Sequence, residues 1–289
     1  MLAVLLACAS AALFGAMAVA IRFALRRTDD PVLGALATST VALAVTLTIG
    51  IVSSVGDSLQ ASDLWPFLLA GVIAPGLSQV LFTQAVRDAG AARTAVLMGT
   101  APLASVAIAL IVLNEPLQAP LLFGAALIVA GGVALAGERV RPEDFKRLGM
   151  LFALAATVMF AIRDNLLRWL AGRTDAHALV TAPVTLLAGA GTISLYLVVT
   201  RGRGWSTGFG QTICLFLPSG LLFGLSYAAL FEAYYRGRVS VVAPLVATES
   251  LWGVLFASLF LRRSELVGRR LIVGAGLIVA GGVLIGAWR

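Results

Sequence analysis

One ten-residue segment occurs twice in this chain, and it constrains the fold more than any other feature. Residues 124–133 read GAALIVAGGV and residues 274–283 read GAGLIVAGGV, so nine of ten positions are identical. The copies lie 150 residues apart in a chain of 289 residues. Each copy falls at the end of one half of the chain. This spacing indicates two copies of one structural unit.

The composition shows in which solvent such a unit folds. Hydrophobic residues make up 60% of the chain and charged residues 12%, whereas soluble domains are about half apolar and about a quarter charged. The net charge of +7 comes from basic residues that stand singly or in pairs between apolar runs. They are interpreted as membrane flanks and not as a nucleic-acid surface. We therefore expect an integral membrane protein with the lipid bilayer as its surroundings and no nucleic-acid partner.

The apolar runs predict ten transmembrane helices, five in each half. About 20 helical residues cross a hydrocarbon core of about 30 Å, and the fifth run is near the lower limit. The first run has no Lys or Arg before Arg22, so we interpret it as a retained helix and not as a signal peptide. The predicted spans are residues 1–23, 32–53, 64–85, 94–113, 120–136, 148–170, 178–200, 212–234, 239–261 and 268–287.

An odd number of spans in each half determines how the halves relate. A five-helix unit ends on the side of the membrane opposite to where it began, so the second copy inserts upside down. The fold class is therefore all-α, with a first repeat at residues 1–137, a connecting loop at 138–147 and a second, inverted repeat at 148–289. Inverted repeats are typical of secondary transporters, which bind substrate near the bilayer midplane between the halves.

Several short motifs connect the chain to a known family. They are Phe14-Gly15, where the family usually has Trp-Gly, Pro102 followed by Glu115, Gly131-Gly132, and Glu265 with Gly281-Gly282 in the second half. With them, essentially the whole chain resembles the drug/metabolite transporter superfamily in its ten-helix EamA branch. Trp252 stands where the first half has Pro102, so a bend in the ninth span would depend on Pro244. The resemblance implies transport of amino acids, drugs, sugar derivatives or other metabolites.

The glycine motifs and the two turn acids are interpreted as structural. Small residues let helix backbones approach closely in lipid, which accounts for Gly131, Gly132, Gly281 and Gly282, and for the Gly220–Gly224 pair. Glu115 and Glu265 lie in the turns before the fifth and tenth spans, where they can pair with an Arg or cap a helix.

Glu249 is the clearest candidate for a substrate-binding residue. It lies near the middle of the ninth span, where a charge costs about 2.5 to 3.5 kcal/mol on insertion scales and so usually faces the bundle interior. Trp252 and Phe256 follow at i+3 and i+7 on the same helix face. A carboxylate beside two aromatic rings fits an ammonium group or a proton. The alternative is a protonated Glu249 that hydrogen-bonds to a neighbouring helix.

A second cluster lies in the sixth span. Arg163 and Asp164 are adjacent, so we expect at most one of them to face a central cavity. Arg163 is the candidate substrate ligand, and the alternative is that it snorkels to the interface. Residue type and position indicate further candidates for the polar or aromatic lining of the cavity. They also indicate candidates for helix breaks or gates. The lining candidates are Gln79, Thr83 and Tyr227, and the helix-break candidates are Pro75, Gly76, Pro102 and Pro244.

These residues predict a secondary transporter and leave its substrate open. In the first hypothesis a zwitterion such as an amino acid places its carboxylate on Arg163 and its ammonium on Glu249, and the protein exports it in exchange for protons. The competing hypothesis is a cation exporter that uses Glu249, Trp252 and Phe256 alone, and a flippase for a lipid-linked metabolite is a third. Single-channel currents would favour a passive channel, which the inverted repeat and the mid-helix acid disfavour.

An enzyme is disfavoured, because the chain has one histidine, His177, and no nucleophile or metal motif. We therefore expect no cofactor and no metal.

The distribution of basic residues predicts the orientation in the cell membrane. By the positive-inside rule, the richer side is cytoplasmic, which places both termini outside. Ten-helix relatives are generally drawn with both termini in the cytoplasm, so this prediction departs from the resemblance. The richer side holds Arg22, Arg26, Arg27, Arg87, Arg93, Arg139, Arg141, Lys146, Arg147, Arg201, Arg203, Arg262, Arg263, Arg269 and Arg270, and the poorer side holds Arg168, Arg173, Arg236, Arg238 and Arg289.

Overall fold

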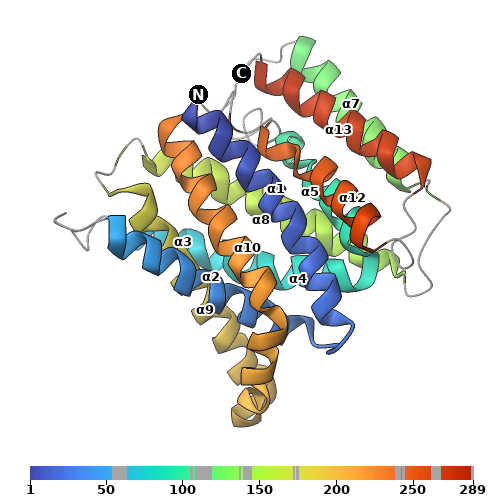
Figure 1. Ribbon diagram of the computed structural model, residues 1–289. Coiled ribbons are helices and arrows are strands. Elements are labelled where there is room, and N and C mark those ends of the chain that lie inside the picture. The colour runs from blue at the N-terminus through green and yellow to red at the C-terminus, as the bar shows by residue number, and fades with distance from the viewer. Residues whose placement is uncertain are drawn as a thin grey trace.

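The structure is a computed structural model, and its described part consists of helices and the turns between them, with no strand. It describes residues 1–53, 64–104, 107, 119–136, 138, 145–171, 173, 176–237, 242, 245–261 and 268–287. Glu115, Glu265 and Pro244 lie outside this described part. Figure 1 shows long helices that run side by side, with α7 and α13 as a pair at one edge.

The helices of the described part overlap the predicted spans, and much of the fourth span and the start of the ninth lie outside this part. The first half contains α1 (Leu2–Leu25), α2 (Pro31–Ser53), α3 (Trp65–Gly71), η2 (Val72–Leu77), α4 (Ser78–Ala89), α5 (Ala91–Met98) and α7 (Ala119–Ala136). The second half contains α8 (Arg147–Ala171), α9 (Ala178–Arg201), η3 (Gly202–Ser206), α10 (Phe209–Arg236), α12 (Glu249–Phe260) and α13 (Arg269–Ala287).

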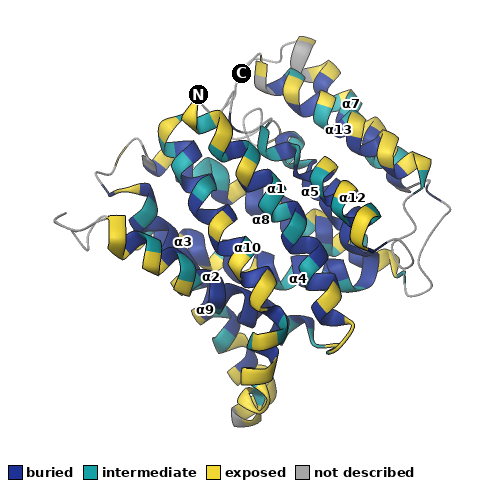
Figure 2. Cartoon of the chain, in the orientation of Figure 1, coloured by how far each residue is buried: buried dark blue, intermediate teal, exposed yellow. Residues whose placement is uncertain are grey.

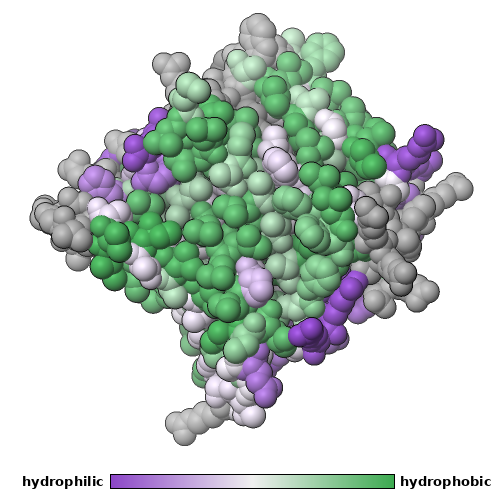
Figure 3. All heavy atoms as spheres, in the orientation of Figure 1, coloured by the Kyte–Doolittle hydropathy of each residue, from purple (hydrophilic) through white to green (hydrophobic). Residues whose placement is uncertain are grey.

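Several of these helices are suited to cross a membrane. Among the described residues, six helices are long and apolar enough to do so by length and composition, and two shorter apolar helices cover Leu122–Leu135 and Leu245–Phe260. Their exposed faces carry large apolar side chains such as Leu69, Val199 and Phe123. The long helices α1, α2, α9 and α10 carry both exposed and buried positions, whereas every residue of α5 is buried (Figure 2). Figure 3 shows a face that is mostly hydrophobic, with hydrophilic residues at its edges, as a lipid-facing surface requires.

The two copies of the repeated motif pack against each other. A Cβ added to Gly124 would lie 2.8 Å from the carbonyl oxygen of Gly281, and one added to Gly281 would lie 2.5 Å from that of Gly124. Gly131 and Gly274 meet in the same reciprocal way, at 2.6 and 2.8 Å. Since 124 pairs with 281 and 131 with 274, α7 and α13 are antiparallel. Each contact is the counterpart of the other, as an inverted repeat requires.

Other glycines bring α10 close to α2. A Cβ on Gly220 would lie 2.4 Å from Cβ of Val41, and one on Gly224 would lie 2.7 Å from Cβ of Val45. Across the same interface, the hydroxyl groups of Thr38 and Ser219 are 2.9 Å apart and form a hydrogen bond. These contacts support the interpretation of the glycine motifs as packing surfaces.

The third span is interrupted in the middle. Ala74 has φ −145° and ψ 119°, which are not helical angles, and the following residue is Pro75. Beside the break, a Cβ on Gly71 would lie 2.2 Å from the carbonyl oxygen of Thr185, and one on Gly189 would lie 2.7 Å from Cγ of Pro75. The break therefore lies directly against the backbone of α9. By contrast, α10 contains Pro218 and continues through 28 residues.

Ion pairs lie at one end of the bundle; one joins the two halves and the other joins the connecting loop to the first half. Arg201 at the end of α9 pairs with Asp30 in the turn before α2, and Lys146 lies 3.6 Å from the carboxylate of Asp88. Burial disfavours the charged form of Asp30, but hydrogen bonds from Arg201 and the backbone N–H of Leu33 outweigh it, so the pKa of Asp30 is below its usual value. Arg201 and Lys146 both belong to the set of basic residues predicted to share one side.

Candidate functional site

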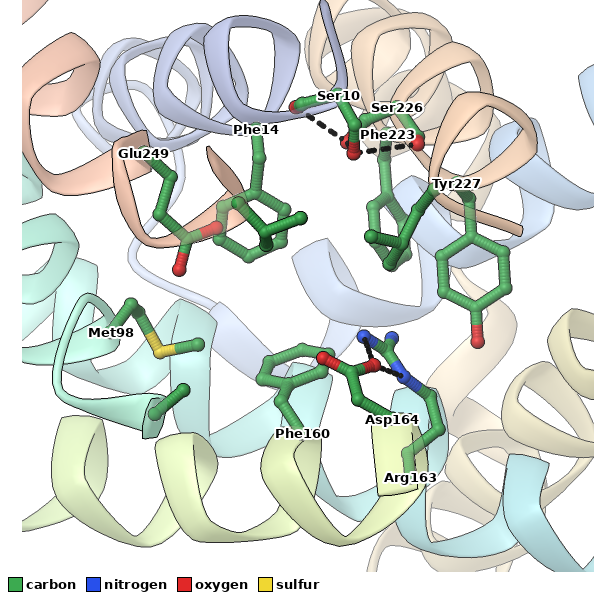
Figure 4. Close-up of a pocket in the computed structure, with 13 residues that line it drawn as sticks. Ser10, Phe14, Met98, Phe160, Arg163, Asp164, Phe223, Ser226, Tyr227 and Glu249 are labelled. Carbon is green, nitrogen blue, oxygen red and sulfur yellow. Dashed lines mark hydrogen bonds and ion pairs between the residues drawn. The ribbon is translucent and has the colours of Figure 1, made fainter. Parts of the chain in front are cut away.

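A pocket lies between α1, α5, α8, α10 and α12, and both halves of the chain contribute to it. It is lined by Ser10, Phe14, Met98, Ala101, Phe160, Arg163, Asp164, Phe223, Ser226, Tyr227, Leu230, Val246 and Glu249. Figure 4 shows the charged groups of these residues facing one space from opposite sides. The pocket is where an inverted-repeat transporter is expected to bind substrate, between the two halves.

Aromatic rings form much of the pocket wall. Phe14 of α1 lies 5.9 Å from Phe160 of α8 and 6.4 Å from Phe223 of α10, measured between ring centroids. Phe82 of α4 packs behind them, 5.1 Å from Phe14 and 6.5 Å from Phe160. This cluster draws two rings from each half of the chain. The negative faces of such rings favour a cationic ligand.

Arg163 and Asp164 both line the pocket, which corrects the expectation that at most one of them would. Nε and Nη2 of Arg163 donate to Oδ1 of Asp164 at 2.9 and 2.6 Å. The guanidinium also lies over the rings of Phe160 and Tyr227, at 4.7 and 5.1 Å from their centroids. The expectation is wrong because the long Arg163 side chain turns back to its neighbour. Arg163 is 4% exposed, so the snorkelling alternative is wrong as well.

Glu249 lines the same pocket and is 7% exposed. Its carboxylate forms no ion pair or hydrogen bond with any other residue in the described ranges. The positions of Glu249 and Arg163 in their spans suggest different depths in the membrane. Both nevertheless line one pocket, because the side chain of Arg163 extends into the cavity (Figure 4). Within the described part of the chain, Glu249 is thus a buried acid that forms no ion pair.

Tyr227 connects the pocket to the break in the third span. Its hydroxyl group accepts a hydrogen bond from Oγ1 of Thr185 at 3.2 Å and lies 3.5 Å from the carbonyl oxygen of Ala74. That carbonyl belongs to the residue with non-helical angles. Tyr227 therefore lies in direct contact both with the pocket and with the irregular part of the third span.

Four of the candidate substrate residues lie outside the pocket lining. The rings of Trp252 and Phe256 stack with their centroids 5.6 Å apart. Trp252 packs against α1, because a Cβ added to Gly15 would lie 2.9 Å from Cβ of Trp252. Gln79 and Thr83 are fully buried in α4. The amide of Gln79 has no hydrogen-bond partner in the described part of the chain, and Thr83 donates to the carbonyl oxygen of Gln79 at 2.9 Å.

The four helix-break candidates differ in whether the structure shows a break beside them. Pro75 and Gly76 lie in η2 immediately after Ala74, where the third span is broken. Pro102 is buried in a helical turn beyond α5, with its ring 3.4 Å from a Cβ built on Gly282. Pro244 falls outside the described residues, so the bend of the ninth span stays a prediction.

The sequence reasoning missed several pocket residues. Phe160 and Phe223 have no mark that separates them from other apolar residues of a membrane helix, although Phe160 lies one turn before Arg163. Ser10 and Ser226 were also missed. Their hydroxyl groups are 3.1 Å apart, and each donates to the other's backbone carbonyl at 2.9 Å. Pairs this far apart in sequence become visible only when α1 and α10 are placed together.

No cluster of three or more possible metal ligands occurs in the described ranges. The chemistry that the lining offers is therefore that of a carboxylate, a paired guanidinium, hydroxyl groups and aromatic rings. Groups of this kind are suited to bind and orient a solute.

Comparisons with known proteins agree with the fold. A family model described as the EamA-like transporter family matches residues 1–136 and 147–287. A solved structure described only as "Crystal structure of protein" is similar with a TM-score of 0.66 and 22% identity, over 98% of this chain and 94% of that one. At this identity the likeness shows the fold alone. A search of curated proteins found no match.

Proposed function

Because this chain belongs to the EamA-like transporter family, we propose that it is a secondary transporter that exports small amines by alternating access. The ten-helix membrane fold in two repeats and the family predicted from the sequence are both confirmed. The substrate, the direction and the coupling ion are our proposal. They rest on the charges in the pocket.

The observation that carries the proposal is the difference between the two acids of the pocket. Asp164 is paired with Arg163, whereas Glu249 has no counter-ion among the described residues. A buried charge without a partner is costly. In the empty pocket Glu249 is therefore balanced by a proton, and in the loaded pocket by a cationic solute. Exchange of one for the other couples the export of an amine to the entry of a proton.

Amino acids are the second candidate substrates. Their ammonium group would bind Glu249 as an amine does, and the observation that favours them is that Arg163 lines the same pocket. Their carboxylate, however, would have to displace Asp164 from Nε and Nη2 of Arg163 or share the guanidinium with it. The zwitterion hypothesis thus needs competition with Asp164 for Arg163, which the amine hypothesis does not.

Transport in proteoliposomes tests the proposal. With an inwardly directed proton gradient, the wild type should exchange protons for phenethylamine, and Glu249→Gln should lose at least about 90% of this exchange, since one charge-assisted contact is commonly worth more than 1.4 kcal/mol, which is tenfold. Glu249→Asp should keep part of it. Glu232→Gln is the matched control, because it also removes a carboxylate but one paired with Arg236 outside the pocket. Normal exchange by Glu249→Gln would refute the proposal.

We also propose that the end carrying the Asp30–Arg201 and Asp88–Lys146 pairs faces the cytoplasm, with the N-terminus outside. The proposal is supported by the excess of basic residues near that end. An N-terminal or C-terminal phosphatase fusion should be active and a fluorescent fusion dark. The reverse pattern would place both termini in the cytoplasm.

A further inference from the structure

The guanidinium of Arg163 is already bound to a carboxylate that belongs to the protein. Oδ1 of Asp164 accepts hydrogen bonds from Nε and Nη2 of Arg163, and Oδ2 lies 3.5 Å from the hydroxyl group of Tyr234. A substrate carboxylate would compete with Asp164 for the Nε and Nη2 donors, and at the other N–H groups it would meet a guanidinium whose charge Asp164 already balances. Asp164 thus stands where such a substrate group would bind.

We propose that Asp164 determines the specificity of the pocket by occupying Arg163, so that the pocket accepts amines and rejects amino acids and other carboxylates. This inference rests on the proposed function, since it concerns which solutes bind beside Glu249. It differs from a purely structural role for the pair, because it requires Arg163 to remain available once the carboxylate of Asp164 is removed.

The contacts of Arg163 meet that requirement. The guanidinium lies over the rings of Phe160 and Tyr227, and neither of these contacts involves Asp164. Asp164 is the next residue on the same helix, so its local concentration at Arg163 far exceeds that of a free solute. A soluble carboxylate therefore competes poorly with it.

The charges of the pocket lead to the same conclusion. Arg163, Asp164 and Glu249 line it, and with both acids ionised their sum is +1 − 1 − 1 = −1, which matches a monovalent cation. In Asp164→Asn the remaining sum is +1 − 1 = 0, with the two opposite charges on different helices, α8 and α12. That arrangement matches a zwitterion.

Binding to the purified, detergent-solubilised protein tests the inference, with calorimetry as the readout. The probes are phenethylamine, phenylalanine, which adds one carboxylate to the same skeleton, and phenylpropionate, which lacks the amine. The wild type should bind phenethylamine at least about tenfold more tightly than phenylalanine, a difference of about 1.4 kcal/mol. Asp164→Asn should bind phenylalanine about tenfold more tightly than the wild type does, and Asp164→Asn combined with Arg163→Gln should lose that gain.

Two further variants keep the result decisive. Glu232→Gln removes the same charge from an ion pair outside the pocket and should behave as the wild type. Tyr234→Phe removes the hydroxyl group beside Oδ2 of Asp164 and should give a smaller gain for phenylalanine, about two- to threefold. If Asp164→Asn does not fold, the affinity of Tyr234→Phe for phenylalanine tests the proposed role of Asp164.

The outcomes separate this inference from the proposed function. If the wild type binds phenethylamine and neither Asp164→Asn nor Tyr234→Phe gains affinity for phenylalanine, the role of Asp164 is wrong and the amine site at Glu249 stands. If the wild type binds phenylalanine as tightly as phenethylamine, Asp164 does not exclude carboxylates. If the wild type binds none of the amines, the proposed function itself fails.

Discussion

The two halves of the chain are alike where α7 packs against α13 and unlike where they enclose the pocket. At the first place, Gly124 meets Gly281 and Gly131 meets Gly274 through the same close backbone contacts. At the second, the described lining from the first half is Ser10, Phe14, Met98 and Ala101, whereas Arg163, Asp164 and Glu249 all come from the second half.

This difference shows how a duplicated fold acquires one specific site. Where the two copies contact each other across the pseudo-two-fold axis, each has to fit the surface of the other. Equivalent residues of the two copies therefore form the same contacts. Around the pocket, the corresponding helices line the cavity and have different neighbours. The third span is broken at Ala74 while α10 is continuous. A symmetric scaffold therefore carries an asymmetric distribution of charge.

The largest effect is expected from breaking the symmetric interface. In Gly281→Leu the new Cβ would lie 2.5 Å from the carbonyl oxygen of Gly124, and backbone atoms of a packed helix pair cannot move aside locally. We expect a loss of about 3 kcal/mol in folding stability, measured as a lower midpoint of thermal unfolding in detergent. Gly132→Leu is the control, because a Cβ there meets no atom within 4 Å. Equal effects of the two substitutions would contradict the interface.

A smaller effect is expected at the asymmetric break of the third span. In Gly71→Ala the added Cβ would lie 2.2 Å from the carbonyl oxygen of Thr185, so α3 must move away from α9. We expect a loss of about 2 kcal/mol, together with slower proton–amine exchange. Gly191→Ala on α9 has open space at its Cβ and should be neutral in both assays. Unchanged stability and transport in Gly71→Ala would show that the break does not depend on this close contact.

The smallest effect is expected at the end of the bundle, where one ion pair joins the halves in contact with water. Asp30→Asn removes the pair with Arg201, which at an exposed site is worth about 0.5 kcal/mol. Because the pKa of Asp30 is lowered in the folded protein, its contribution is present above the unfolded pKa of about 3.9 and is lost as the pH falls through the folded value.

Unfolding midpoints of the wild type and Asp30→Asn should therefore differ at pH 7 and converge below about pH 4. A difference that persists at low pH would mean that the side chain stabilises the turn without its charge.

Much of the fold could be predicted from local information. Long apolar runs give helices that cross a membrane, because backbone polar groups have no other partners in lipid. The repeated glycine motif and five spans in each half then give the inverted repeat. Glu249 could be predicted as a pocket residue for a similar reason, since an acid in the middle of a span is costly to expose to lipid and so usually faces the bundle interior.

What the sequence by itself determined is therefore the helices, their order, the inverted duplication and the presence of an acid in the interior. Only the tertiary structure decided which side chains share the pocket. Trp252 is on the same helix as Glu249, yet it packs against Gly15, and Asp164 faces the pocket beside Arg163. The physical reason is that the rotation of each helix and the partner of each side chain depend on neighbours from distant segments. Helical periodicity within one segment contains no information about those neighbours.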